Sequence, residues 1–255
     1  MTALSYDDRL HARYVEGSTL APGVLATWLA AFRRWFPPRR PLPLADVGSG
    51  AGRFASPLAD GFGGPVVAIE PSKRMRALAA TAGAHPNVCF VAGECEAMPL
   101  ADHAVVGALV FGVWHHLRDR AAGAAELARV VRPSGTLLVR TSASDRLSRP
   151  WWDQWFPEVY ETDRRWLPSF AETAATITMA GWSFVAVDEI VIPAVLTRRQ
   201  DFARLQHRAL STLEHLDDSV VDQGIGRIAA ALAVDPDLDR PAPVAPQDLL
   251  VFRRL

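Results

Sequence analysis

Between residues 42 and 142, short apolar runs alternate with longer stretches that have helical periodicity. The apolar runs are followed by glycine, proline or polar residues, which is typical of buried strands. The intervening stretches indicate helices; that over 72–83, for example, begins at Ser72, a good N-cap residue, and ends at Gly83. Strands that are apolar on both faces and joined through helices form a parallel sheet covered on both sides. The expected strands lie at 41–48, 65–71, 87–94, 104–114 and 136–142.

After Ser142 the pattern changes. Residues 149–168 are rich in tryptophan and have no clean period, and they precede helical patterns at 169–181, 198–216 and 220–232. Two further strands are expected near 184–192 and 248–254. The chain is therefore predicted to be one α/β domain with a doubly wound, mostly parallel seven-stranded sheet. Its expected parts are helices over 1–40, a core over 42–142, and C-terminal strands with helical cap insertions over 143–255.

The first strand runs into the sequence DVGSGAGR, in which Gly48, Gly50 and Gly52 alternate after Asp46. A glycine-rich turn between a strand and a helix lets the backbone approach a nucleotide closely. The dinucleotide fingerprint needs its third glycine one position later, where this chain has Arg53. The spacing therefore favours a nucleoside ligand without a pyrophosphate, and an NAD-dependent oxidoreductase remains an alternative.

Acidic residues follow the next two strands. Glu70 lies about 20 residues beyond the glycine turn, where a carboxylate can accept hydrogen bonds from both ribose hydroxyls. Glu94 follows the third strand and is placed to accept a hydrogen bond from an adenine amino group, with Met98 as an apolar wall. These positions predict an adenosine site at the carboxyl ends of the strands.

Five sequence blocks, DVGSGAGR, AIEPS, GECEAMPL, VFGVWHHLRD and ELARVVRPSGTLLV, occur in this order. Together they resemble the class I S-adenosylmethionine-dependent methyltransferases, most closely the branch that acts on small molecules. The resemblance implies a Rossmann-like methyltransferase fold and direct transfer of a methyl group from S-adenosylmethionine to an oxygen, nitrogen or carbon nucleophile. A non-catalytic cofactor-binding protein, another alkyl transfer and a cyclisation stay open.

The resemblance also implies roles for individual residues. The three glycines back the methionine part of the cofactor, Asp46 steadies their turn, and Glu70 holds the ribose. Glu94 and Cys95 flank the adenine, although the family often has Asp where Glu94 stands. The expected cofactor residues are Asp46, Gly48, Ser49, Gly50, Gly52, Glu70, Pro71, Glu94, Cys95, Glu96 and, from an N-terminal lid, Tyr14.

The acceptor site is expected beyond the fourth and fifth strands. His115 is the candidate general base because histidine titrates near neutrality, with packing as the alternative role. A small, partly apolar acceptor is expected between Trp151–Trp155 and the N-terminal lid. The candidate acceptor-site residues are Tyr6, His11, Trp114, His115, Arg140, Trp151 and Trp155.

The composition limits the kinds of partner that the protein is expected to bind. The formal net charge is −1, so no strong field attracts nucleic acid or an anionic membrane. Two cysteines cannot build a disulfide framework or a four-cysteine zinc site, and no other metal-ligand spacing occurs. The N-terminal segment MTALSYDDRLHARY lacks the apolar run of a secretion signal, so a cytoplasmic protein is expected. The sequence leaves both a monomer and a homodimer open.

Overall fold

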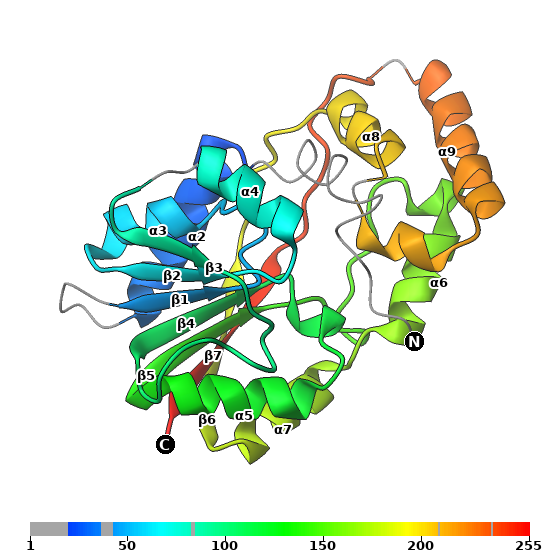
Figure 1. The fold of residues 1–255 in the computed structure, drawn as a ribbon. Coiled ribbons are helices and arrows are strands. Elements are labelled where there is room, and N and C mark those ends of the chain that lie inside the picture. The colour runs from blue at the N-terminus through cyan, green and yellow to red at the C-terminus, as the bar shows by residue number, and fades with distance from the viewer. Residues whose placement is uncertain (1–19, 37–42, 83–84, 209, 236) are drawn as a thin grey trace.

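The computed structural model describes residues 20–36, 43–82, 85–208, 210–235 and 237–255. Seven strands form one sheet in the order β3-β2-β1-β4-β5-β7-β6, which confirms the predicted fold class (Figure 1). The strands are β1 (Leu44–Val47), β2 (Val66–Ile69), β3 (Val88–Val91), β4 (Val105–Phe111), β5 (Val131–Arg140), β6 (Trp182–Ile190) and β7 (Gln247–Arg254). Strands β1 to β5 pair in parallel, whereas β7 is antiparallel to both β5 and β6.

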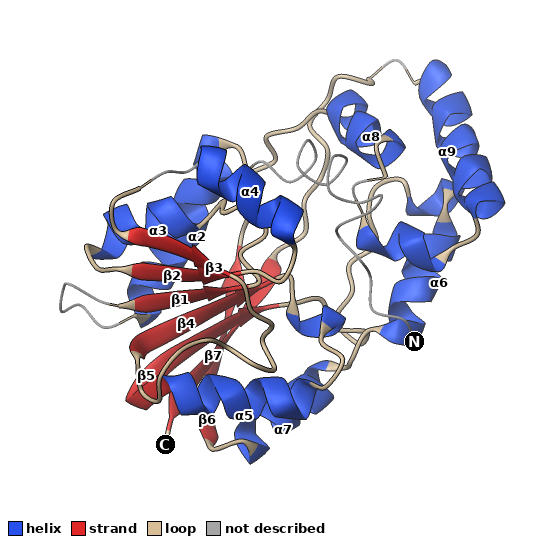
Figure 2. Cartoon of the chain, in the orientation of Figure 1, coloured by secondary structure: helices blue, strands red, loops and turns tan. Residues whose placement is uncertain are grey.

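Helices cover the two faces of the sheet (Figure 2). On one face, α2 (Pro22–Trp35) and α3 (Ala55–Phe62) bury aromatic and aliphatic side chains against β1, β2 and β4. On the other face, α5 (Arg120–Val130) and α7 (Phe170–Met179) pack against β4, β5 and β7. Helix α4 (Lys73–Ala82) lies against β3, and the Ser72 Oγ accepts the Met75 N–H at 3.2 Å, as its predicted N-cap role requires.

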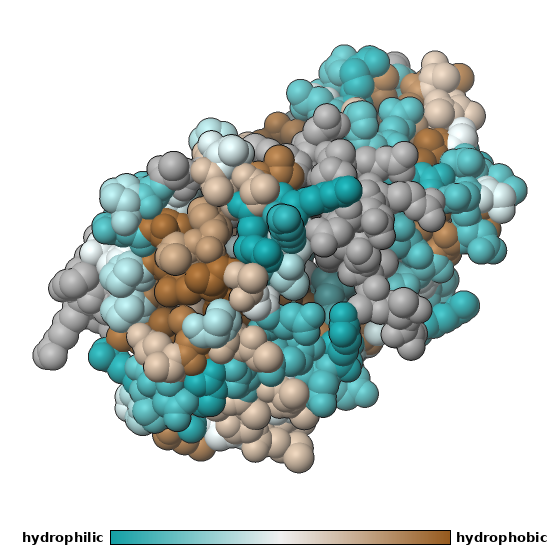
Figure 3. Space-filling view, viewed as in Figure 1, coloured by the Kyte–Doolittle hydropathy of each residue, from teal (hydrophilic) through white to brown (hydrophobic). Residues whose placement is uncertain are grey.

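The connection from β3 to β4 is a loop over 92–104, whereas the earlier connections between parallel strands contain helices. The sheet near β3 is consequently less covered on this side. Cys89 is exposed, and Val67, Val91 and Leu100 are only partly buried. Figure 3 shows an apolar patch over these strands.

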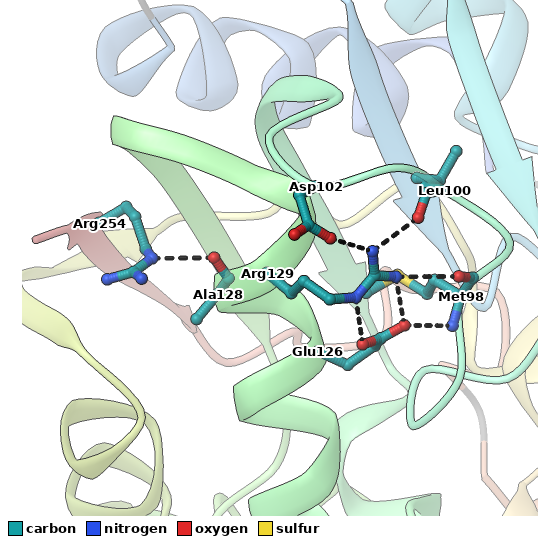
Figure 4. Close-up of polar contacts among 7 residues, drawn as sticks. All are labelled: Met98, Leu100, Asp102, Glu126, Ala128, Arg129 and Arg254. Atoms are coloured by element: carbon teal, nitrogen blue, oxygen red, sulfur yellow. Dashed lines mark hydrogen bonds and ion pairs between the residues drawn. The ribbon is translucent and has the colours of Figure 1, made fainter.

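Arg129 of α5 fixes this loop (Figure 4). Its guanidinium donates to the carbonyl oxygens of Met98 (3.1 Å) and Leu100 (2.7 Å) and to the Asp102 carboxylate (2.8 Å). Glu126 accepts from the same guanidinium at 2.6 and 2.8 Å and from the Met98 N–H at 2.8 Å. The network ties the segment that follows Glu94 and Cys95 to the rigid face of α5.

A helical cap lies beyond the carboxyl ends of the parallel strands (Figure 1). It comprises η3 (Asp153–Trp155), α6 (Pro157–Trp166), α8 (Arg198–Gln206), η4 (Ser211–His215) and α9 (Asp218–Ala233). These elements surround an apolar cluster of their own: Trp152, Phe156, Val159, Phe202, Leu205, Leu213, Val221, Ile228 and Leu232. The cap is thus a second packing unit, built by segments far apart in the sequence.

The helix predicted over 198–216 is interrupted. Helix α8 ends at Gln206 and η4 begins at Ser211, because Arg208 takes a left-handed conformation with φ of 53°. The Arg208 guanidinium is paired with Asp218 and, at 2.9 Å, with Asp222 of α9. Of the helices that the structure describes, none has both the length and the apolar character needed to cross a membrane.

Candidate functional site

A cavity opens at the carboxyl ends of β1, β2 and β4. The strand order reverses between β1 and β4, and open α/β sheets bind ligands at such a reversal. Nine predicted cofactor residues line the cavity: Asp46, Gly48, Ser49, Gly50, Glu70, Pro71, Glu94, Cys95 and Glu96. The predicted lid residues Tyr6, His11 and Tyr14 lie outside the described residues.

The turn after β1 needs its glycines. Gly48, Gly50 and Gly52 have φ of 69°, 56° and 80°, a region that L side chains rarely adopt. A Cβ on Gly48 would also lie 2.3 Å from a methyl carbon of Val113. Gly52 does not line the cavity; it lets Phe90 and Ala79 pack closely beneath the turn. At Gly48 and Gly50 the turn therefore presents backbone to the cavity.

Glu70 is buried at the end of β2, and the backbone fixes its carboxylate. One oxygen accepts the Gly50 N–H at 2.9 Å, and the other accepts the Ser72 N–H at 2.9 Å. A carboxylate has about four acceptor positions, so each oxygen can also accept from a hydroxyl. The geometry suits recognition of a vicinal diol.

Asp46 brings a buried charge to the same cavity. Among the residues that the structure describes, neither its Oδ2 nor the nearby Ser49 Oγ has a hydrogen-bond partner. Burial raises the pKa of Asp46 to about 7, with Glu70 adding to the shift and Arg53 opposing it. A buried carboxylate oxygen without a partner is the complement of a cationic group, which would supply the missing hydrogen bonds.

The loop after β3 forms the far end of the cavity. Glu94 is half exposed and lies 3.9 Å from the Arg118 guanidinium, whereas the Cys95 thiol is buried and burial raises its pKa. Glu96 accepts the N–H groups of Arg118 (3.0 Å) and Asp119 (3.4 Å), so it fixes the turn before α5.

Several lining residues were not predicted, and most are apolar walls: Arg53, Phe54, Met75, Phe111, Val113, His116 and Leu117. Two of these residues could have been identified from their positions in the sequence. Arg53 follows the glycine turn directly, and Met75 falls in the first turn after the Ser72 N-cap.

Of the two histidines after β4, the structure brings His116, and not the predicted His115, to the cavity. His115 is buried, with Nδ1 at 3.0 Å from the Thr141 Oγ1, and it does not line the cavity; His116 does. Burial, reinforced by His116, holds the pKa of His115 well below its usual value. Burial and His215 lower the pKa of His116 to about 4. Both imidazoles are neutral near pH 7, and the geometry favours a packing role for His115 over the predicted role as base.

The structure also corrects the expected acceptor wall. Trp114 is fully buried in the core between the sheet and α5, so it does not contact the cavity. Trp151 and Trp155 pack against the cap cluster, and the Trp151 indole donates to Asp201 at 2.8 Å. Arg140 donates to the Gln247 side chain at 3.0 Å and lies 5.5 Å from the ring centre of Phe111, beside the cavity.

Comparison with known proteins agrees with this geometry. Residues 45–139 match the family model of a methyltransferase domain. Residues 45–139 therefore form a methyltransferase domain, and the fold is that of the class I S-adenosylmethionine-dependent methyltransferases. It is 35% identical over 114 residues to an uncharacterized methyltransferase of Mycobacterium tuberculosis, covering 44% of this chain and 45% of that protein. It is 33% identical over 122 residues to a demethylmenaquinone methyltransferase of Corynebacterium kroppenstedtii, covering 48% and 51%.

The chain thus matches only about half the length of these curated relatives. A solved protein described as a methyltransferase from an antibiotic biosynthesis pathway of Anabaena variabilis shares the fold over more of the chain. That match has a TM-score of 0.73 at 21% identity and covers 90% of this chain and 97% of that one. The fold therefore extends beyond residues 45–139 and includes part of the segment that carries the cap.

S-adenosylmethionine is the cofactor of this family, and the cavity fits it. The partnerless Asp46 Oδ2 suits a cationic ammonium, the fixed carboxylate of Glu70 suits a ribose diol, and the glycine turn leaves room for the backbone to approach. Among the described residues, no group of three or more His, Cys, Asp or Glu side chains is arranged to hold a metal ion.

Proposed function

We propose that this protein transfers a methyl group from S-adenosylmethionine to an oxygen, nitrogen or carbon nucleophile of a small, partly apolar molecule. The observation that carries the proposal is the coexistence, in one cavity, of a buried and partnerless Asp46 Oδ2, a backbone-fixed Glu70 and a left-handed glycine turn. A pyrophosphate would bring negative charge next to two buried carboxylates, which disfavours NAD.

Each part of the cavity has a proposed task. Glu70 accepts hydrogen bonds from the two ribose hydroxyls, and Asp46 with Ser49 holds the ammonium of the methionine part. The Cys95 N–H and Glu94 bind the adenine, and Glu96 and Arg129 keep their loop in place. S-adenosylmethionine supplies a methyl group on a sulfonium, which is already a good leaving group. The protein therefore has mainly to align the acceptor and exclude water.

A small acceptor agrees with the charge of this chain and with the name of one of its relatives. The near-neutral sequence has no excess of basic residues for nucleic acid. One relative is named for demethylmenaquinone, which supports an acceptor of small, partly apolar character.

Calorimetric titration tests the cofactor assignment. We expect S-adenosylhomocysteine to bind with a 1:1 stoichiometry and NAD not to bind. Binding of NAD in preference to S-adenosylhomocysteine would contradict the proposal. Formation of S-adenosylhomocysteine from S-adenosylmethionine in the presence of acceptor candidates then separates an enzyme from a protein that only binds the cofactor.

A further inference from the structure

Four aromatic rings meet where the cap joins the end of β4. His115 and His116 come from η2 (Trp114–His116), and Trp166 and His215 come from the cap. The Trp166 ring lies 5.4 Å from His115, edge to face, 5.9 Å from His116 and 4.4 Å from His215, between ring centres. Because His116 lines the cofactor cavity, this cluster adjoins the cavity wall at the β4 end.

Asp163 fixes the positions of Trp166 and of the segment that carries His215. Its Oδ1 accepts from the Trp166 indole N–H at 3.0 Å and from the Thr212 hydroxyl at 2.7 Å, three residues before His215. Burial raises the pKa of Asp163. Trp166 and the η4 segment are therefore fixed to each other, which is a condition for a preorganised binding site.

His215 carries an unsatisfied polar atom in this setting. Its Nε2 is buried and has no hydrogen-bond partner among the described residues. Buried polar atoms in folded proteins nearly always have a partner in the protein, in water or in a ligand. An unsatisfied imidazole nitrogen beside an indole ring suits a ligand that has both an aromatic face and a hydrogen-bonding group.

We propose that Trp166 and His215 form the acceptor site, and that the acceptor class is a hydroxyl-bearing aromatic ring. The ring packs on the Trp166 indole, and its hydroxyl donates a hydrogen bond to the His215 Nε2. This inference rests on the proposed methyltransferase function and specifies its acceptor. It also moves the acceptor from Trp151–Trp155, which pack inside the cap, to the junction between the cap and the sheet.

A matched pair of ligands tests the inference: 2-naphthol and 2-methoxynaphthalene share the rings, but only 2-naphthol can donate a hydrogen bond. Each is titrated into protein saturated with S-adenosylhomocysteine, with affinity read by calorimetry and the His215 Nε2 followed by ¹⁵N NMR. We expect 2-naphthol to bind about 3- to 10-fold more tightly, as one hydrogen bond predicts, and to shift the Nε2 resonance.

Three variants sharpen the test. His215→Phe keeps a ring without an acceptor nitrogen, so it should abolish the difference between the two ligands. Trp166→Leu should weaken the binding of both ligands. Trp35→Phe is the control and should change the binding of neither, because Trp35 lies outside the proposed site. Like Trp166, Trp35 is partly buried and its indole donates to a carboxylate, that of Asp188 (2.6 Å). Thermal unfolding of each variant checks that it folds.

The outcomes separate the two proposals. If S-adenosylhomocysteine does not bind the wild-type protein, the proposed function fails. If it binds but the naphthalenes bind equally, not at all, or without dependence on His215, the acceptor site fails alone. The ligand pair on the wild-type protein decides the point even if His215→Phe does not fold.

Discussion

The cofactor cavity and the cap are built by different means. The cavity is made by strand ends and by backbone in the left-handed region, with Asp46 and Glu70 buried beside it. The cap is made by side chains from five elements around Trp152 and Phe156. The comparison indicates that cofactor recognition is concentrated in short stretches of sequence, whereas acceptor recognition depends on contacts between distant segments.

The largest expected effect is in the glycine turn. Gly48→Ala adds a Cβ at 2.3 Å from Val113 and forces φ of 69° on an alanine. The backbone strain costs about 1–2 kcal/mol and the overlap about 1–3 kcal/mol. We expect the free energy of unfolding, measured in urea, to fall by about 2–5 kcal/mol, with S-adenosylhomocysteine bound about 100-fold more weakly.

Gly112→Ala is the matched control for stability. Gly112 has φ of 73°, but among the described residues other than its chain neighbours no atom lies within 4 Å of the added Cβ, so only the backbone strain applies. A loss of stability as large as that of Gly48→Ala would contradict the close approach of Val113 as the cause.

The next effect concerns Glu70. Hydrogen bonds from the ribose hydroxyls to a carboxylate are charge-assisted and contribute about 1.5–3 kcal/mol each. Glu70→Gln should weaken S-adenosylhomocysteine binding at least about tenfold in calorimetry. Glu70→Ala should weaken it further, because the Gly50 and Ser72 N–H groups also lose their acceptor. Equal dissociation constants for wild type and both variants would count against the ribose site.

Asp46 should make cofactor binding depend on pH. Its pKa of about 7 in the free protein falls when a cationic ammonium binds, so affinity for S-adenosylhomocysteine should rise from pH 6 to 7 and level off above. Asp46→Asn should bind several-fold more weakly at pH 8 and show no such rise.

The same residue affects the stability of the free protein in the opposite sense. The folded-state pKa of Asp46 lies above its unfolded value of 3.8, so ionisation destabilises the fold as pH rises from about 4 to 7. Asp46→Asn should therefore raise the free energy of unfolding at pH 8 by about 1–3 kcal/mol. A variant that is less stable at pH 8 and tighter in binding would refute both expectations.

The core of the fold was predictable because its signals are local. Apolar runs marked the strands, Ser72 marked the start of α4, and the spacing of Gly48, Gly50 and Gly52 indicated the turn. Glu70 and Glu94 were indicated by their positions after the next two strands, the family resemblance added Pro71, Cys95 and Glu96, and all five line the cavity.

The cap was not predictable to the same depth. Periodicity gave its helices, but it could not show that the tryptophans after Arg149 turn inward onto α8 and α9. The contact of Trp166 with His215 joins residues 49 positions apart, and no local pattern marks it. The break at Arg208 was missed because non-glycine residues seldom adopt positive φ, and it depends on pairing with α9.

The smallest effect on the cofactor should come from Asp163 in the cap. Its Oδ1 accepts both the Trp166 and the Thr212 hydrogen bonds, so Asp163→Asn can keep both through its amide oxygen while removing a buried charge. Asp163→Ala leaves two partly buried donors without an acceptor. We expect unfolding free energies to fall by about 1–3 kcal/mol for Asp163→Ala and to change little for Asp163→Asn.

Both Asp163 variants should bind S-adenosylhomocysteine within about twofold of wild type, because Asp163 is not in the cavity lining. Affinity for 2-naphthol should fall in Asp163→Ala alone, since only that variant releases Trp166. Calorimetry with the two ligands therefore reads the cavity and the cap separately. If Asp163→Ala weakened cofactor and naphthol binding equally, the cavity and the cap would form one coupled site. That result would contradict the conclusion that the cavity recognises the cofactor and the cap recognises the acceptor independently.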